Sequence, residues 1–239
     1  MRKKKHRDER LELCREFIYE PSGEPMADPS AELFGRTGAP VYLEIGAGKG
    51  GFAVGTVSRE PEVCYIALER VTDCVMLAAE RAKRETPGSR LLFVNDTADN
   101  LTRLLAPGTV DRIFLNFSDP WSKKGYSKRR LTHRRYLAVY MSLLKIGGKL
   151  RFKTDNVGLF DFTLEELSAS GIVPDAVTRD LHSSEYNEGN VVTEYEANFS
   201  SLGVKINMLE LTKREESSLV IPEELSQGRK NYAASGEPL

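Results

Sequence analysis

Acidic residues in this sequence stand where short apolar runs end, a placement that suits the binding of a cationic or hydroxyl-rich ligand. The run "VYLEI" (41–45) contains one such acid, and "CYIALE" (64–69) ends in another. In open sheets of parallel strands, ligands bind in the crevice beyond the carboxyl ends of the strands. The five acids in question are Glu44, Glu69, Asp96, Asp119 and Asp155. Chance places an acid at an exposed strand end often enough, but five in one crevice favour a binding site.

The stretch "NFSDPWSKK" (116–124) adds a second kind of chemistry, because an acid and an aromatic ring stand directly before a run of cations. Pro120 restricts the backbone, so that Asp119 and Trp121 point in reproducible directions. Trp121 is the only tryptophan of the chain. It either walls a base pocket or packs where the strand leaves the sheet, and packing is the preferred interpretation.

The segment between Asp119 and Asp155 contains no acid, although the formal net charge of the whole chain is only −1. Its cations are Lys123, Lys124, Lys128, Arg129, Arg130, Arg134, Arg135, Lys145, Lys149, Arg151 and Lys153. Such a concentration of positive charge is typical of a surface that binds a polyanion such as nucleic acid. The alternative is a solvated helix face, which we expect for Arg134, Arg135 and Lys145.

A glycine-rich loop follows the first of these strands and opens a helix. Gly46, Gly48 and Gly51 satisfy the dinucleotide pattern G-x-G-x-x-G, with Glu69 about 20 residues further on. Glu44 lies just before the loop and would repel a pyrophosphate, but it would attract a cation. The pattern therefore favours S-adenosylmethionine, which carries a sulfonium and an ammonium group and no phosphate, over a dinucleotide.

The other strand-end acids can be assigned to parts of that ligand. Glu69 suits the two ribose hydroxyls as a paired acceptor, and Asp96 is placed to face the adenine amine. The alternative for Glu44 is a buried or helix-capping acid, because a buried carboxylate needs partners.

The elements that must position these residues alternate along the chain. Strands are expected at 41–45, 64–69, 90–95, 111–117 and 149–155, and helices at 51–58, 71–85, 131–145 and 157–170. We expect Gly147 and Gly148 to stop the helix that precedes them. The alternation predicts an α/β fold of the Rossmann-like type, a mainly parallel twisted sheet with helices on both faces. About residues 172–211 should add two strands joined by a loop.

Three regions follow from composition. Residues 1–39 form a basic lead-in, irregular or partly helical, with "RKKKHR" as a disordered arm that adds RNA affinity. Residues 40–211 form the catalytic domain, and residues 212–239 form a polar tail that we expect to be loosely ordered. Three unpaired cysteines and the absence of a long apolar stretch favour a cytoplasmic protein without a membrane span, and scattered histidines favour no metal. A monomer is preferred over a homodimer.

Several blocks together resemble the bacterial tRNA (guanine-N7)-methyltransferases: "LEIGAGKGGF", "YIALE", "LNFSDPW", "SKRRLT", "GGKLRFKTDN" and "VVTEYEANFSSLG". The resemblance runs from about Val41 to Glu210 with the blocks in the family's order. It implies a class I S-adenosylmethionine-dependent fold and methylation of a guanosine in the variable loop of tRNA.

The resemblance also implies roles for individual residues. It makes Asp119 the catalytic residue and a cofactor contact, together with Glu44, Glu69 and Asp96, while Gly46 and Gly48 supply the cofactor loop. The implied substrate contacts are Lys123, Asp155, Thr193, Glu194, Tyr195 and Glu196. The implied RNA-binding loop is Gly125, Tyr126, Ser127, Lys128, Arg129 and Arg130. Many members have Arg-His at the first two loop positions, so this chain lacks one positive charge there, although Tyr126 could stack on a base.

Guanine N7 presents a free lone pair, so no base has to remove a proton before methyl transfer. The expected work of the protein is to align the reacting atoms and to place Asp119 beside a ring that becomes cationic. Thr193 and Glu194 could instead be ordinary strand-edge residues, and Asp155 could be the N-cap of the helix near Val157. Two other functions stay open: methylation of a different acceptor, or tRNA binding without catalysis.

Overall fold

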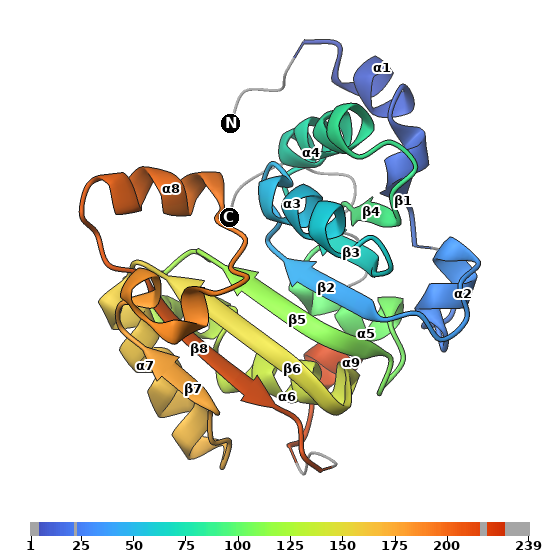
Figure 1. Cartoon of the computed structure of the whole chain (residues 1–239). Coiled ribbons are helices and arrows are strands. Elements are labelled where there is room, and N and C mark those ends of the chain that lie inside the picture. Colours follow the sequence, from blue (N-terminus) through green and yellow to red (C-terminus); the bar gives the residue numbers. More distant parts are fainter. Residues whose placement is uncertain (1–4, 22, 216–218, 228–239) are drawn as a thin grey trace.

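The computed structural model describes residues 5–21, 23–215 and 219–227, and its centre is a sheet of eight strands (Figure 1). Their order across the sheet is β1-β4-β3-β2-β5-β6-β8-β7. The pairs from β1 to β6 are parallel, whereas β8 pairs antiparallel with both β6 and β7. The strands are β1 (Ile18–Tyr19), β2 (Val41–Ile45), β3 (Cys64–Leu68), β4 (Leu91–Val94), β5 (Val110–Asn116), β6 (Leu144–Thr154), β7 (Ala176–Thr178) and β8 (Asn207–Thr212).

Helices cover both faces of the sheet, which confirms the predicted α/β architecture. In Figure 1, α3 and α4 lie on one face, and α6, α7 and α9 lie on the other. The α-helices are α1 (Arg7–Glu12), α2 (Pro29–Phe34), α3 (Gly51–Arg59), α4 (Thr72–Glu85), α5 (Leu101–Leu104), α6 (Arg134–Leu143), α7 (Val157–Ala169), α8 (Glu194–Ser201) and α9 (Glu223–Ser226).

Successive side chains of a strand point to opposite faces of the sheet, so the residues of β2 are divided between the two cores. Val41, Leu43 and Ile45 belong to the larger core beneath α5, α6 and α7. Tyr42 packs in the second core, beneath α3 and α4. Glu44 has the same parity as Tyr42, so its carboxylate lies on the α3 side.

The site is positioned by the reversal of strand order between β2 and β5. From β2 the chain adds β3 and β4 on one side, and after β4 it crosses to add β5 and β6 on the other. At such a point the two connections leave in opposite directions and open a crevice beyond the strand ends. The arrows of β2 and β5 point toward this edge, and α8 lies beyond it (Figure 1).

The prediction that Gly147 and Gly148 stop a helix was wrong. Helix α6 ends at Leu143, and both glycines lie inside β6. The register of β5 and β6 shifts between Val110 and Arg112. A Cβ on Gly148 would stand 2.9 Å from the carbonyl oxygen of Lys145 and 3.1 Å from that of Val110, so the residue is small because two backbones approach closely there.

Described parts of the lead-in and of the tail pack against the sheet. Strand β1 pairs with β4 at the edge of the sheet, and Phe17 and Met26 are buried in the two cores. In the tail, Leu225 of α9 is 1% exposed and packs in the larger core. Residues 1–4 of the expected basic arm lie outside the described residues, as do 216–218 and 228–239 of the tail.

The connection between β7 and β8 is also not a simple loop, because it contains α8. Thr193 is the N-cap of this helix, and its side-chain oxygen accepts a hydrogen bond from the backbone N–H of Glu196. Thr193 and Glu194 are therefore not strand-edge residues.

Across the described ranges, no helix is both long enough and apolar enough to span a bilayer.

Candidate active site

The glycine-rich loop between β2 and α3 is held by backbone hydrogen bonds to the end of β3. Gly46 and Ala47 both donate their N–H groups to the carbonyl oxygen of Leu68, at 2.8 and 3.0 Å. Gly50 has a φ of +73°, and a Cβ there would stand 2.8 Å from the Cβ of Ala78 on α4. This position therefore requires glycine for its conformation as well as for the close packing of α3 on α4.

Glu69 joins the loop to the start of α4. One carboxylate oxygen accepts a hydrogen bond from the N–H of Gly48 at 2.9 Å, and the other accepts one from the N–H of Val71 at 2.8 Å. Each carboxylate oxygen can accept a second bond, so the group keeps capacity for two hydroxyl donors. Glu69 thus organises the loop and remains suited to a ribose.

Glu44 is 1% exposed and is held by two neutral donors. The Tyr65 hydroxyl donates to it at 3.2 Å, and the Asn116 amide nitrogen donates at 3.0 Å. Burial raises the pKa of Glu44 to about 7, because these donors and the positive charge of Lys153 offset only part of the desolvation. A cationic ligand beside this carboxylate would favour its ionised form.

Binding of S-adenosylmethionine should therefore depend on pH through Glu44. A positive ligand binds the ionised carboxylate, so protonation below about pH 7 weakens binding and association at lower pH releases a proton. Relative to Glu44→Gln, we expect the Kd of the wild-type protein to rise about tenfold between pH 8 and pH 6. Isothermal titration of both proteins checks this, since titration of the ligand itself is common to the two. Parallel pH profiles would contradict the assignment.

Three buried polar atoms near this edge of the sheet have no hydrogen-bond partner among the described residues. They are Thr97 Oγ1 beyond β4, Asn116 Oδ1 at the end of β5, and Ser118 Oγ two residues later. A buried polar atom without a partner destabilises the protein, unless a ligand completes its bonding. These atoms fit a ligand rich in amino and hydroxyl groups, and S-adenosylmethionine is of this type. Asp96 instead accepts bonds from Thr97 N–H and the Asn100 amide, both at 2.7 Å.

The segment after β5 holds Asp119 between two residues with left-handed backbone. Phe117 has a φ of +52° and Trp121 has a φ of +42°. Bulky residues rarely adopt this conformation, and such outliers concentrate at functional sites. Asp119 is 67% exposed and accepts a hydrogen bond from the Arg70 guanidinium at 3.2 Å. Sequence reasoning missed Arg70, although its place directly after Glu69 was a signal that it reaches the same edge.

Trp121 packs against residues 125–130, which we call the basic loop. Its ring meets Tyr126 edge-on at 5.9 Å, and the Arg129 guanidinium lies 5.1 Å from the ring centre. Arg130 donates hydrogen bonds to the carbonyl oxygens of Pro120 and Trp121, at 2.9 and 3.2 Å. These contacts tie the 3₁₀ turn η3 (Lys124–Arg129) to the segment that carries Asp119.

The described cations of the basic segment differ in their partners. Lys123, Lys128 and Arg129 are exposed and make no ion pair with a described residue. Six cations have carboxylate partners: Arg134 with Glu166 at 2.9 Å, Arg135 with Asp99 at 2.8 Å, Lys145 with Asp111 at 2.8 Å, Lys149 and Arg151 with Glu210, and Lys153 with Glu196. Arg130 instead donates to backbone carbonyl oxygens. The prediction of solvated helix positions was wrong for Arg135, whose side chain is mostly buried, and for Lys145, which lies in β6. The exposed cations of this segment that have no carboxylate partner in the described chain are therefore those near Asp119.

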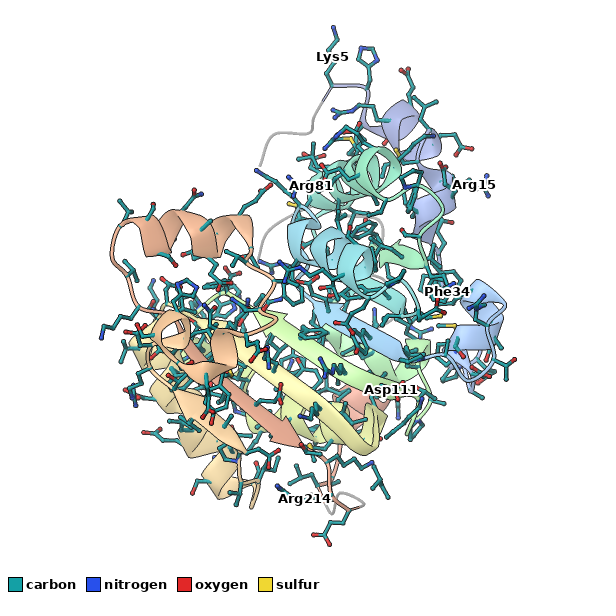
Figure 2. The ribbon with its side chains drawn as sticks, in the orientation of Figure 1. Lys5, Arg15, Phe34, Arg81, Asp111 and Arg214 are labelled. Atoms are coloured by element: carbon teal, nitrogen blue, oxygen red, sulfur yellow. The ribbon has the colours of Figure 1, made fainter. Side chains whose placement is uncertain are left out.

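The predicted substrate residues of α8 are divided between surface and interior. Tyr195 is 44% exposed, and its ring lies 5.0 Å from that of Phe117. Burial, together with the negative charge of Asp155, raises the pKa of Tyr195, so Asp155 lies near this ring. Glu194 forms an ion pair with Arg81 of α4, which is labelled in Figure 2. Glu196, by contrast, is completely buried.

The structure also decides the role of Asp155 at the start of α7 and bears on metal binding. The N-cap of α7 is Asn156, whose side chain accepts from Leu159 N–H at 2.8 Å, so Asp155 is not the cap. Within the part of the chain that the structure describes, no group of three His, Cys, Asp or Glu side chains could hold a metal ion.

The reversal of strand order, the glycine-rich loop and the acids at the strand ends define a class I S-adenosylmethionine-dependent methyltransferase. Two solved structures have the same fold. One, described as an antibiotic related methyltransferase, is 17% identical with a TM-score of 0.55, and the match covers 80% of this chain and 96% of that one. The other, the 16S rRNA methyltransferase KamB, is 15% identical with a TM-score of 0.54, over 72% of this chain and 87% of that one.

Sequence comparison identifies the family. Residues 38–209 match the family model Methyltransf_4, described as "Putative methyltransferase". A tRNA (guanine-N(7)-)-methyltransferase of Lachnoclostridium phytofermentans is 46% identical over 74% of this chain and 82% of its own length. One of the same name from Halalkalibacterium halodurans is 44% identical over 72% and 77%. The chain belongs to the tRNA (guanine-N7)-methyltransferase family.

Proposed function

We propose that this protein transfers a methyl group from S-adenosylmethionine to N7 of a guanosine in the variable loop of tRNA, in the cytoplasm. The observation that carries the proposal is the position of Asp119. This exposed acid stands between two residues of left-handed backbone and directly before cations that have no ion-pair partner among the described residues. An acid for the base beside cations for the phosphates suits one nucleotide of an RNA.

Residues at the strand ends would hold the cofactor. Glu69 would accept from the ribose hydroxyls, Glu44 would face the positive charge of the methionine part, and Asp96 lies where the adenine is expected. When bound there, S-adenosylmethionine supplies an activated methyl group on a sulfonium. The unpartnered oxygen atoms of Asn116 and Ser118 would complete their hydrogen bonding in the same crevice.

The guanine would lie beside Asp119, with Tyr195 and Phe117 offering ring faces and Asp155 close by. The Asp119 carboxylate can accept hydrogen bonds from guanine N1–H and the 2-amino group, which adenine does not offer in the same pattern. It also stabilises the positive charge that develops on the purine as N7 is methylated. Because N7 needs no deprotonation, no residue is required as a general base.

The basic loop would hold the tRNA backbone. The double variant Lys128→Ala, Arg129→Ala removes two exposed cations that have no carboxylate partner in the described chain. We expect its KM for tRNA to rise about tenfold at 0.15 M salt, with a log-log salt slope smaller by about one per lost phosphate contact. Steady-state kinetics at several salt concentrations measure both quantities. Lys145→Ala is the matched control, because it removes a cation paired with Asp111 at the opposite end of the sheet. Equal effects of the two variants would contradict a local role for the loop.

One assay tests the proposed function directly. Purified protein is incubated with an unmodified tRNA transcript and S-adenosylmethionine labelled in the methyl group, and the tRNA is then digested and its nucleosides are identified. Label in 7-methylguanosine that maps to the variable loop supports the proposal. Labelled cofactor that binds but transfers nothing to tRNA would contradict it and would direct the search to other RNA acceptors.

A further inference from the structure

Lys153 of β6 carries a completely buried charge next to the proposed site. Its ammonium lies 2.6 Å from a carboxylate oxygen of Glu196, and neither side chain has any exposed surface. The rings of Phe52 and Phe117 lie 5.0 and 6.0 Å from the ammonium. A buried ion pair of this kind is costly to desolvate and is weak as a source of stability, so its geometry invites another explanation.

All three hydrogen-bond donors of Lys153 point to one segment of the chain. They reach the Asn190 amide oxygen at 3.0 Å, the Val191 carbonyl oxygen at 3.1 Å and the Glu196 carboxylate. We call residues 190–196 the strap. One side chain of the central sheet therefore fixes both ends of the strap.

Glu196 passes this constraint on to α8. Its second carboxylate oxygen accepts from the Asn190 amide and meets His182 Nε2, both at 2.8 Å. The oxygen that meets Lys153 also accepts from the backbone N–H of Thr193, which completes the capping box that starts the helix. The direction in which α8 leaves the strap is thus set by a residue that Lys153 holds.

The strap contacts α3 and α4 as well as the sheet. The Arg59 side chain donates to the Asn190 carbonyl oxygen at 3.0 Å, and a Cβ on Gly55 would stand 2.8 Å from Val191. Glu194 reaches Arg81 on α4. The strap therefore extends from the end of β6 to the helices that follow the cofactor loop, and Tyr195 stands on it, exposed, over Phe117.

We propose that Lys153 is a positioning residue, which holds the strap so that Thr193, Glu194 and Tyr195 meet the guanosine. Glu196 takes part from the interior as the acceptor of Lys153, and it does not touch the substrate. The inference rests on the proposed function, because it assigns the strap to recognition of the nucleotide.

The test requires variants that keep the fold. Lys153→Met alone would leave a buried carboxylate without its partner, so it is combined with Glu196→Gln, whose side chain still caps α8. Lys149→Met on the same strand, whose partner is Glu210, is the matched control.

Two measurements are made on each protein. Hydrogen exchange of amides 194–201, recorded without any ligand, reports whether the strap is anchored. Kinetics with tRNA and the Kd of S-adenosylmethionine report whether the anchoring affects use of the tRNA substrate or binding of the cofactor. For the double variant we expect faster exchange in α8, a fall of about 100-fold in kcat/KM for tRNA and a change of less than about threefold in the cofactor Kd. The control Lys149→Met should stay close to wild type.

Two results would overturn the inference. Unchanged exchange in the double variant would show that Lys153 does not anchor the strap, and faster exchange with unchanged kcat/KM would show that the anchoring does not serve the substrate. A wild-type protein that transfers no methyl group to tRNA would instead contradict the proposed function. The exchange measurement would then still decide whether Lys153 anchors the strap.

Discussion

Asp119→Asn is expected to lower kcat for tRNA methylation by about 100- to 1,000-fold, the loss that follows removal of one preorganised charge-stabilising group. The asparagine keeps the size of the side chain but loses the negative charge beside the purine. Its amide nitrogen would also face the N1–H and 2-amino donors of guanine, so the base would lose its orientation. Single-turnover kinetics with saturating tRNA and cofactor measure the chemical step directly.

The control for this variant is another exposed aspartate that forms an ion pair with an arginine. Asp161 on α7 pairs with Arg179 at 2.6 Å and is 49% exposed, so Asp161→Asn removes a comparable charge away from the strand ends. We expect wild-type kcat for the control. A kcat of Asp119→Asn within about threefold of wild type would rule out an electrostatic role for this acid.

Glu69→Ala is expected to raise the Kd of S-adenosylmethionine by about 100-fold, comparable to the loss of a charged hydrogen-bonding group at a buried contact. The carboxylate has two tasks, since it accepts from Gly48 and Val71 and is the proposed acceptor for the ribose. Removal of the carboxylate would loosen the glycine-rich loop and leave the ribose hydroxyl groups of the cofactor without their proposed acceptor. Isothermal titration or competition with S-adenosylhomocysteine measures the effect.

Loss of the fold is the competing explanation for that result. Thermal unfolding without ligand separates the two, and Glu62→Ala serves as the control, because Glu62 is a surface acid near the opposite end of β3. The tRNA affinity of Glu69→Ala in a gel-shift assay should stay within about threefold of wild type, since phosphate contacts dominate RNA affinity. If cofactor affinity were retained, Glu69 would be a structural support for the loop only.

The sequence was informative wherever local pattern decides structure. Strands β2 to β5 and helices α3, α4 and α7 lie within a few residues of their predicted positions, because short apolar runs and amphipathic helices carry their own periodicity. Strand β1 was missed, since two residues, Ile18 and Tyr19, show no period. Helix α8 was missed although Thr193 and Glu196 form the capping-box pattern that marks a helix start.

The site was predictable in composition and less so in geometry. The acids at strand ends were visible because topology alone brings them to one edge. The partners of Arg134 and Arg135 were not, because Glu166 and Asp99 are more than 30 residues away from them in sequence. The same holds for Lys153, which looked like one more cation of the basic segment and is in fact buried against Glu196.

The pairing of β1 with β4 covers an edge of the sheet that could otherwise pair with another molecule. Without it, β4 would be the outermost strand, with a row of unpaired N–H and C=O groups facing solvent. Such an edge is a template for the strand of another molecule. A fragment trimmed to residues 40–211 would keep the predicted cofactor and substrate residues, but it would expose this edge and lose the buried Phe17 and Leu225. The lead-in thus covers the edge of the sheet. Its removal would lower the solubility of the protein, although the predicted site residues would remain.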